Sequence, residues 1–417
     1  MLLRISGVRD MKRKLLVVSL STLTCLSLGS CDILSNLGGL QGGLTAKEVR
    51  DYTEEVMDTT REYLVSLAEG DKYHLDIDTK FNAEYNISVE NSSTYDSETS
   101  RESLSGSING NATATAKLNL LEINKGSLKG SDGSLKGQLE AVNSYDDSIT
   151  KDETKQKYEF DFSANDKELK VKVKDNDYNT NETYQMSAYE TEVAASIAKA
   201  AIVFPEDLIF DLTIPSSGET SRIDLSILDE VNDKTNQFKD KEISALEYVE
   251  YLDSQFLGNE LKNGLEKEDY NLIVKVFEKH ESILPEYFFT AKKTEEKGYT
   301  LLKGEFDYAS WVVAFGVAVA DILKEEVDDL ESVLDLVERF TTSYLPSKFE
   351  MSYVLKVDNN GCFAGYTYDM RVQGNATEEV EWSNNSGSFV DTTKVNYTGS
   401  AHFELNFRAG NTPSPKK

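Results

Sequence analysis

Cysteine, histidine and tryptophan are scarce in this chain, whose 417 residues include three cysteines, three histidines and two tryptophans. Zinc, haem and iron–sulfur sites draw on thiolate and imidazole ligands, so this composition excludes most arrangements of that kind. Two tryptophans also give little material for an aromatic platform under a sugar, although 21 tyrosines leave that class open. We therefore expect no metal site and no cofactor.

Positive charge is also in short supply, with 44 basic against 73 acidic residues and a formal net charge of −29. Such a surface repels phosphate backbones, so a nucleic-acid partner is not expected. After residue 30 the most apolar stretch is 311–320, which is too short for a membrane-spanning helix of about 20 residues. We expect this stretch to be buried on all sides and packed against a sheet.

Motifs of catalysis are missing as well. Neither GxxxxGK(S/T) nor GxGxxG follows a predicted strand, and no GxSxG is present, which removes the nucleotide loop and the serine-hydrolase elbow. His74 and His402 fall on the polar phase of alternating segments and should be solvated, while His280 has only Glu281 beside it. We expect no catalytic residue and a protein that is not an enzyme.

An acidic segment, 175–182, places oxygen-bearing side chains at alternate positions, as calcium-binding loops do. It has Thr180 where such loops need glycine and Met186 where they need an acid. A solvated hairpin tip is the favoured interpretation, and a calcium site is the alternative.

The N-terminus carries a targeting pattern. A positive segment, 11–14, precedes an apolar segment, 15–28, and the sequence then reads Leu28-Gly29-Ser30-Cys31. This ending resembles the lipobox of bacterial lipoproteins. The alternative is a plain secretory signal with a chance cysteine.

The lipobox resemblance implies that residues 1–30 are a signal peptide, that Cys31 is the lipidation site and that the protein is anchored to a membrane of the bacterial cell envelope. Residues 31–43 contain four of the chain's glycines, which predicts a flexible tether. Met11 is the expected start, because residues 2–10 add nothing to a signal peptide. Neither the membrane nor its face follows from the pattern.

The cysteines leave no material for an internal disulfide. Cys25 lies in the signal peptide and Cys31 takes the lipid, so Cys362 remains alone. It follows Asn360-Gly361 at a predicted hairpin turn, where we expect a structural role.

Alternation of apolar and polar residues predicts long antiparallel strands near both ends of the chain. The clearest segments are 73–89, 104–120, 349–357, 366–372 and 395–407, with shorter ones at 135–142, 158–162 and 169–173. Between the two groups, helical spacing and capping residues predict helices near 188–204, 244–258 and 266–284, the last of which has strand character as well. Another helix is expected before the first strand, ending at Gly70.

The fold class is therefore α+β, with curved antiparallel meanders at both ends and helices packed against the sheet. We expect an N-terminal helix plus meander over 44–240, a helical segment plus second meander over 241–408, and a disordered tail over 409–417. Whether the meanders form one sheet or two, and the oligomeric state, are not predicted.

The order helix, long meander, helices and closing meander is similar to the lipoprotein-carrier (LolA-like) fold, in which a half-closed barrel with helices in its mouth holds acyl chains. That resemblance implies a half-barrel cavity for an apolar or lipid-like ligand. The residues proposed to line it are Ala112, Ala114, Ala116, Trp311 and Phe315. Alternatively, the alanines let a helix approach the sheet closely, and the protein is a structural or surface-interaction lipoprotein with a filled core.

Overall fold

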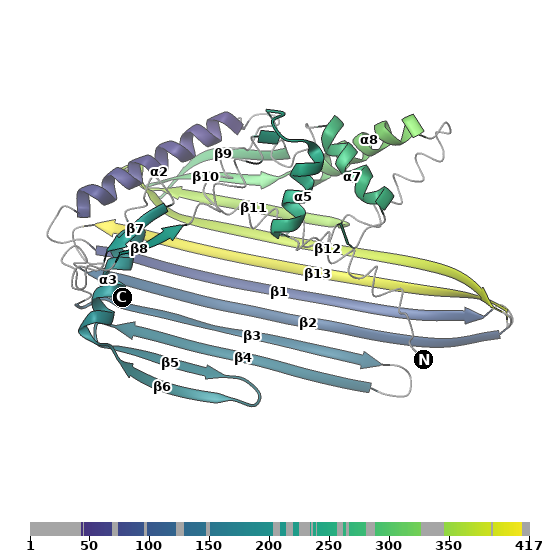
Figure 1. The fold of residues 1–417 in the computed structure, drawn as a ribbon, viewed down its shortest axis with the longest axis horizontal. Helices are drawn as coiled ribbons and strands as arrows, with labels where there is room; N and C mark the ends of the chain where they lie inside the picture. The colour runs from purple at the N-terminus through teal and green to yellow at the C-terminus, as the bar shows by residue number, and fades with distance from the viewer. Residues whose placement is uncertain are drawn as a thin grey trace.

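The computed structural model describes residues 43–44, 46–68, 74–95, 98–121, 129–146, 151–202, 209–213, 220–224, 234, 237–238, 240–256, 262–263, 267–280, 288–326, 346–384 and 387–410. Its main feature is a single open sheet of eleven antiparallel strands in the order β6-β5-β4-β3-β2-β1-β13-β12-β11-β10-β9 (Figure 1). The strands are β1 His74–Tyr95, β2 Glu98–Leu121, β3 Asp132–Asp146, β4 Lys151–Asn165, β5 Glu168–Lys174, β6 Asn179–Gln185, β9 Phe289–Glu296, β10 Tyr299–Phe306, β11 Lys348–Val357, β12 Phe363–Asn384 and β13 Gly387–Gly410.

Two meanders meet in the middle of this sheet. Strands β1 to β6 run outward on one side, and β13 to β9 run outward on the other. The seam is the pairing of β1 with β13, which extends in register from His74↔Gly410 to Tyr95↔Phe389. The parts predicted as 44–240 and 241–408 therefore share one sheet, and the expected sheet-rich fold with helices is confirmed.

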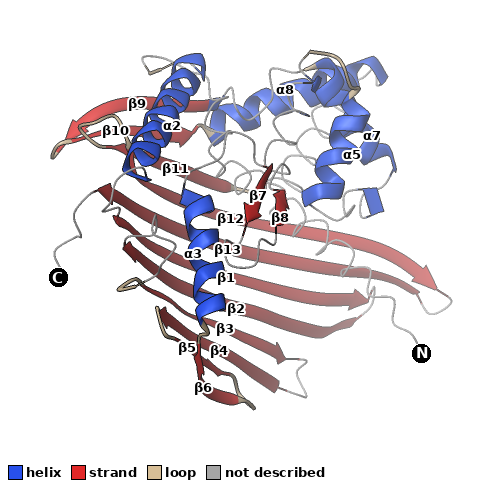
Figure 2. Ribbon diagram, turned by 60° about the vertical axis from the view of Figure 1, so that its left-hand side comes forward, coloured by secondary structure: helices blue, strands red, loops and turns tan. Residues whose placement is uncertain are grey.

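The helices lie on one side of the sheet, which we call the inner face (Figure 2). They are α2 Ala46–Ala68, α3 Ala188–Ile202, α5 Ala245–Phe256, α7 Lys267–Lys279 and α8 Tyr308–Glu326, joined there by the β7 (Ile209–Thr213) and β8 (Thr220–Asp224) hairpin. Leu64 and Leu67 of α2 pack on Leu75 of β1 and Leu120 of β2, which fixes the strand phase that points inward.

The main core lies between α2 and strands β9 to β12. Val49 and Val56 of α2 meet Phe289, Leu302 and the alternate residues of β11 from Phe349 to Val357. The strict alternation of β11, buried at every second residue, follows from one face meeting this core and the other meeting solvent. Burial of apolar surface contributes about 25 cal/mol per Å² to the free energy of unfolding, so these side chains are the main source of stability for α2 and strands β9 to β12.

One end of α2 is fixed to the β11–β12 turn. Thr60 accepts a hydrogen bond from the backbone N–H of Phe363 at 2.7 Å and donates one to the carbonyl of Val56 at 2.6 Å. The turn itself is closed by Asp358, whose carboxylate accepts hydrogen bonds from the backbone N–H groups of Asn360 and Cys362. Gly361 takes φ +81°, a conformation that favours glycine.

Four aromatic side chains lie directly over glycines of the neighbouring strand, all on the inner face. The cross-strand pairs are Tyr85 with Gly110, Phe160 with Gly137, Tyr353 with Gly304, and Tyr397 with Gly374. A Cβ atom at any of these glycines would overlap the ring. The glycines therefore let large rings lie flat on the sheet, a form of cross-strand stabilisation.

Helix α8 corrects the expectation that residues 311–320 are buried on all sides. Phe315 is 7% exposed and packs with Val276 of α7, whereas Val313 and Val317 are 67% and 64% exposed. At its start Trp311 contacts Phe306 of β10. The segment therefore packs mainly on another helix and touches the sheet at one end.

Two smaller expectations are settled by the described elements. The segment 266–284 contains the helix α7. At the start of α5, Ser244 and Glu247 form a capping box. The backbone N–H of Glu247 donates to the Ser244 hydroxyl at 3.2 Å, and the backbone N–H of Ser244 donates to the Glu247 carboxylate at 2.8 Å. The hydrogen bond from the Ser244 N–H, and a second one from the Ser244 hydroxyl at 2.8 Å, lower the pKa of the Glu247 carboxyl. Strand β6 was not predicted, because NTNETYQ is exposed at every position except Thr180 and shows no apolar alternation.

Candidate functional site

The inner face of strands β1 to β6 exposes large apolar side chains. Its register continues the phase set by Leu75 and Leu120, so these side chains share the face on which the helices lie. They are 37% to 50% exposed and comprise Tyr85, Ile108, Leu118, Leu135, Leu139, Tyr145, Tyr158 and Tyr184. A large exposed apolar patch on a folded protein commonly marks a site that binds a ligand, a partner or a membrane. We call this set the open apolar face.

The three predicted alanines lie within the open apolar face. In the register, Ala112 pairs with Leu139, Ala114 with Gly137, and Ala116 with Leu135. All three alanines are half-buried. They form a low strip between taller side chains, so a ligand or a helix can come close to the backbone there.

Trp311 and Phe315 lie elsewhere. They stack on each other at 5.4 Å between ring centroids, and Phe315 belongs to the α7–α8 cluster. Five strand positions separate β2 from β10, which Trp311 touches, or roughly 24 Å across the sheet. The structure therefore does not bring Trp311 and Phe315 together with the alanine strip.

The leucines and tyrosines of β3 to β6 were missing from the predicted pocket. Leu135 and Leu139 belong to an alternating segment that was recognised as a strand, but the sequence does not say which strand faces remain uncovered. Tyr158 and Tyr184 lie in strands with many charged or polar residues, so their sequences show little apolar alternation from which an exposed apolar face could be predicted.

Cys362 lies at the β11–β12 turn, as expected, and is only 4% exposed. Its sulfur is 3.9 Å from the carbonyl oxygen of Thr59 in α2. Burial, and to a lesser extent the nearby Asp358 carboxylate, raises the pKa of the Cys362 thiol to about 11. The group is therefore a protonated thiol at neutral pH and a poor nucleophile.

The histidines correct one expectation and support another. His74, the first residue of β1, is buried rather than solvated, and its Nδ1 atom has no partner among the described residues. His402 is exposed on the polar face, with Nδ1 2.8 Å from a carboxylate oxygen of Asp369. His280 lies 3.4 Å from Asp321 of α8, a pair that sequence spacing did not indicate.

Residues 175–178 form a turn rather than a ligand cage. The Asp175 carboxylate accepts hydrogen bonds from the backbone N–H groups of Asp177 and Tyr178. Across the part of the chain that the structure describes, no group of three or more histidine, cysteine or acidic residues is placed to hold a metal ion. No helix among the described residues is long and apolar enough to cross a bilayer. The signal peptide, Cys31 and the tether up to residue 42 lie outside the described residues.

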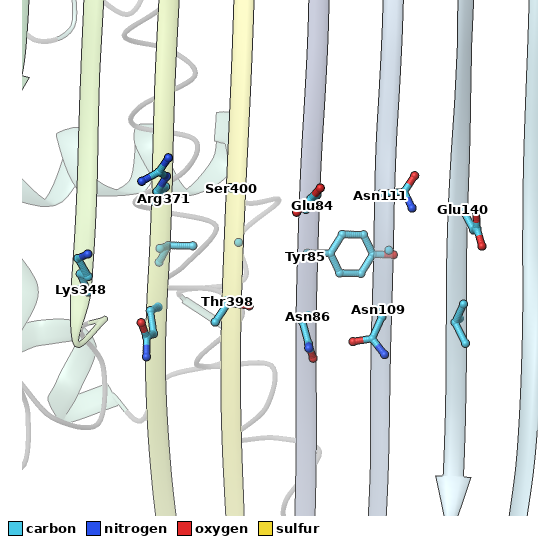
Figure 3. Close-up of a pocket in the computed structure, with 15 residues that line it drawn as sticks. Glu84, Tyr85, Asn86, Asn109, Asn111, Glu140, Lys348, Arg371, Thr398 and Ser400 are labelled. Carbon is cyan, nitrogen blue, oxygen red and sulfur yellow. The ribbon is translucent and has the colours of Figure 1, made fainter.

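The opposite, outer face carries a polar hollow of about 570 Å³ across the seam (Figure 3). Two rows of residues, each in register across neighbouring strands, form its sides. One row consists of Lys348, Gln373, Thr398, Asn86, Asn109 and Val142, and the other of Arg371, Ser400, Glu84, Asn111 and Glu140. The floor between the rows includes the backbone of Gly110 and Gly399. We call this feature the outer hollow.

Charge is distributed unevenly along the outer hollow. Lys348 and Arg371 lie at the β11–β12 end, where Glu350 is 2.7 Å from Lys348 and 4.0 Å from Arg371. The hydrogen bond from Lys348 lowers the pKa of Glu350. Glu140 lies toward the β3 end, and Glu84 lies on β1 between Ser400 and Asn111 (Figure 3). The other side chains in the middle are amides and hydroxyls.

No family model and no curated protein matches this chain. Solved structures resemble it weakly. A FadL homologue from Pseudomonas aeruginosa aligns over 82% of this chain and 91% of its own, with 6% identity and a TM-score of 0.12. The outer membrane protein opdK from the same organism aligns over 81% and 99%, with 7% identity and a TM-score of 0.08. Scores this low carry no argument about fold or function.

Proposed function

We propose that this chain is a lipid-anchored protein of the bacterial cell envelope that binds an apolar or lipid-like ligand against the inner face of its sheet, without catalysis. The observation that supports the proposal is the open apolar face, eight large side chains that are 37% to 50% exposed on one side of β1 to β6. Burial of apolar surface by a ligand supplies a favourable free energy in proportion to the area covered.

The predicted lipid anchor would hold the sheet close to a membrane. The tether that follows Cys31 ends at Gly43, and the next residue, Leu44, is hydrogen-bonded to Ala291 of the edge strand β9 at 2.8 Å. Twelve extended residues span at most about 42 Å, so this edge of the sheet would lie within that distance of the membrane surface. Acyl chains would then be within reach of the inner face.

Ligand binding can be tested with N-phenyl-1-naphthylamine, a dye that fluoresces in apolar surroundings, and by native mass spectrometry of protein extracted from membranes. Leu135→Asn with Leu139→Asn should weaken dye binding at least tenfold, because both side chains lie on the open apolar face. Val142→Asn is the matched control, since it lies on the same strand but on the outer face. Equal dye binding by all three proteins would refute the proposal.

The anchor has its own test. Cys31→Ala should leave the membrane fraction or retain its signal peptide, and labelled palmitate should be incorporated only into the wild type. A wild-type protein that is soluble and unlabelled would contradict the lipoprotein assignment.

The second candidate is a structural or surface-interaction lipoprotein with a filled core. The large polar outer face favours it, because a sheet that wide offers a surface for contact with another envelope component. Native mass spectra without any bound small molecule, together with unchanged dye binding in the leucine variant, would support this candidate.

A further inference from the structure

We propose that the outer hollow is a second binding site, which takes a neutral polyhydroxylated chain, that is, an uncharged oligosaccharide. This site lies on the face of the sheet opposite the open apolar face, so it is independent of the apolar ligand proposed above. The proposal rests on the shape of the hollow, on its hydrogen-bonding groups and on the ligand classes that its composition disfavours.

The shape is that of a trough that crosses the strands. The longer row of residues extends from β11 to β3, and its five strand spacings make the trough roughly 24 Å long. The strands that form its middle are paired on both sides, so their backbone groups are already used in the ladders. A ligand here must be recognised by side chains, and an extended peptide that adds to a sheet edge is disfavoured.

Apart from the Glu84 carboxylate, the side chains in the middle of the trough both donate and accept hydrogen bonds. Asn86 and Asn109 are direct cross-strand partners, and Asn111 and Ser400 lie in the adjacent row. Asn109 has unused capacity, because its Nδ2 makes only a long bond of 3.4 Å to Ser107 and its Oδ1 atom, which is buried, accepts no hydrogen bond from any described residue. Paired amides match sugar hydroxyls, which also donate and accept.

Other ligand classes fit poorly. Val142 is the one apolar side chain in the two rows, so an acyl chain would gain little by lying in the trough. An anionic polymer would approach Glu84 and Glu140 in a chain whose net charge is −29, and the cations at the far end are already beside Glu350. None of the side chains in the two rows is aromatic, so hydrogen bonds rather than stacking would hold the sugar.

The test uses the full chain in a zwitterionic detergent without a sugar headgroup, titrated by calorimetry. Cellohexaose, maltohexaose and chitohexaose are the neutral probes, and a heparin hexasaccharide is the anionic probe. Asn86→Ala combined with Asn109→Ala should weaken binding of the neutral probe about tenfold or more, from about three- to tenfold for each amide. Asn82→Ala is the matched control, an exposed asparagine on the same face of β1 that lies outside the outer hollow.

A second variant keeps the test decisive. Ser400→Trp fills the middle of the trough from a half-buried outer position and should abolish binding while leaving the melting temperature and dye binding unchanged. Dye binding that is retained while oligosaccharide binding is lost would separate this site from the inner face. The proposal is overturned if no neutral probe binds at millimolar concentration, if only the heparin fragment binds, or if the double variant binds as tightly as the wild type.

Discussion

Single glycines decide whether the large rings of the inner face can lie flat. Gly304 lies beneath the ring of Tyr353, which is 2% exposed and whose pKa is raised by burial. A methyl group at this position has no space, because the ring is held by the surrounding core.

Gly304→Ala should therefore destabilise the protein by about 1–3 kcal/mol through overpacking. Gly106→Ala is the matched control, since a Cβ there meets only an ordinary contact 3.5 Å away. Urea unfolding of the two variants checks the prediction, and equal midpoints would show that the ring moves aside without cost.

Cys362 gives the stability of the fold a dependence on alkaline pH. Its folded pKa is raised to about 11, whereas a thiol in an unfolded chain ionises near about pH 8.5. The unfolded state therefore loses its proton first, so this contribution to stability is complete below about pH 8.5 and is lost as the pH rises toward about 11.

Cys362→Ala removes that contribution. The variant should lose about 2 kcal/mol less stability than the wild type between about pH 8 and pH 10.5, and it should retain any ligand binding. Urea unfolding at several pH values measures the difference, in which tyrosine ionisation common to both proteins cancels. Parallel stability profiles would mean that the thiol is not shielded by the fold.

At the scale of elements, alternation in the sequence identified most of the strands, because one face of each meets either the core or the open apolar face while the other meets water. Strand β6 was missed because it is an exposed edge whose pairing with β5 comes from the β5–β6 turn at Asp175 rather than from burial. The composition of α8 suggested burial all round, but a helix at the rim of the molecule buries only the face that meets α7.

The two faces of α8 should respond differently to charge. Phe315→Asp should lower the free energy of unfolding by about 3–5 kcal/mol, since it removes a buried ring and places a carboxylate against Val276. Val317→Asp, two residues away and 64% exposed, should change it by no more than about 0.5 kcal/mol. Thermal unfolding followed by circular dichroism compares them, and equal melting temperatures would place Phe315 outside the core.

For the molecule as a whole, the sequence predicted two meanders but not their union. The seam pairs β1 with a strand more than 300 positions away in the sequence. For example, Lys80 Nζ lies 3.0 Å from Glu404 Oε2. No local sequence pattern indicates which distant strand will pair with β1. The outer hollow was missed for the same reason, because its residues run from Glu84 to Ser400 and each is an ordinary polar residue of a solvated strand. These residues form two rows only once the strands have paired in the observed register.

A chain that stops after residue 386 lacks β13 and should not fold, because β1 and β12 both lose a partner strand and apolar side chains such as Phe403 and Phe407 are removed from the core. A chain that stops after residue 410 keeps every described strand and should melt as the wild type does. Solubility and far-ultraviolet circular dichroism distinguish the two. A folded, soluble product that lacks β13 would show that the halves are stable separately.

The position of β13 at the centre of the sheet has a consequence for biogenesis. About 300 residues lie between the end of β1 and the end of β13, so a ribosome that adds roughly 5–20 residues per second needs about 15–60 s to supply the missing neighbour. During that interval β1 presents an unpaired edge, and the nascent meander is open to pairing with other chains. The last strand to be made closes the middle of the sheet, which makes the growing chain a natural client for a holding chaperone.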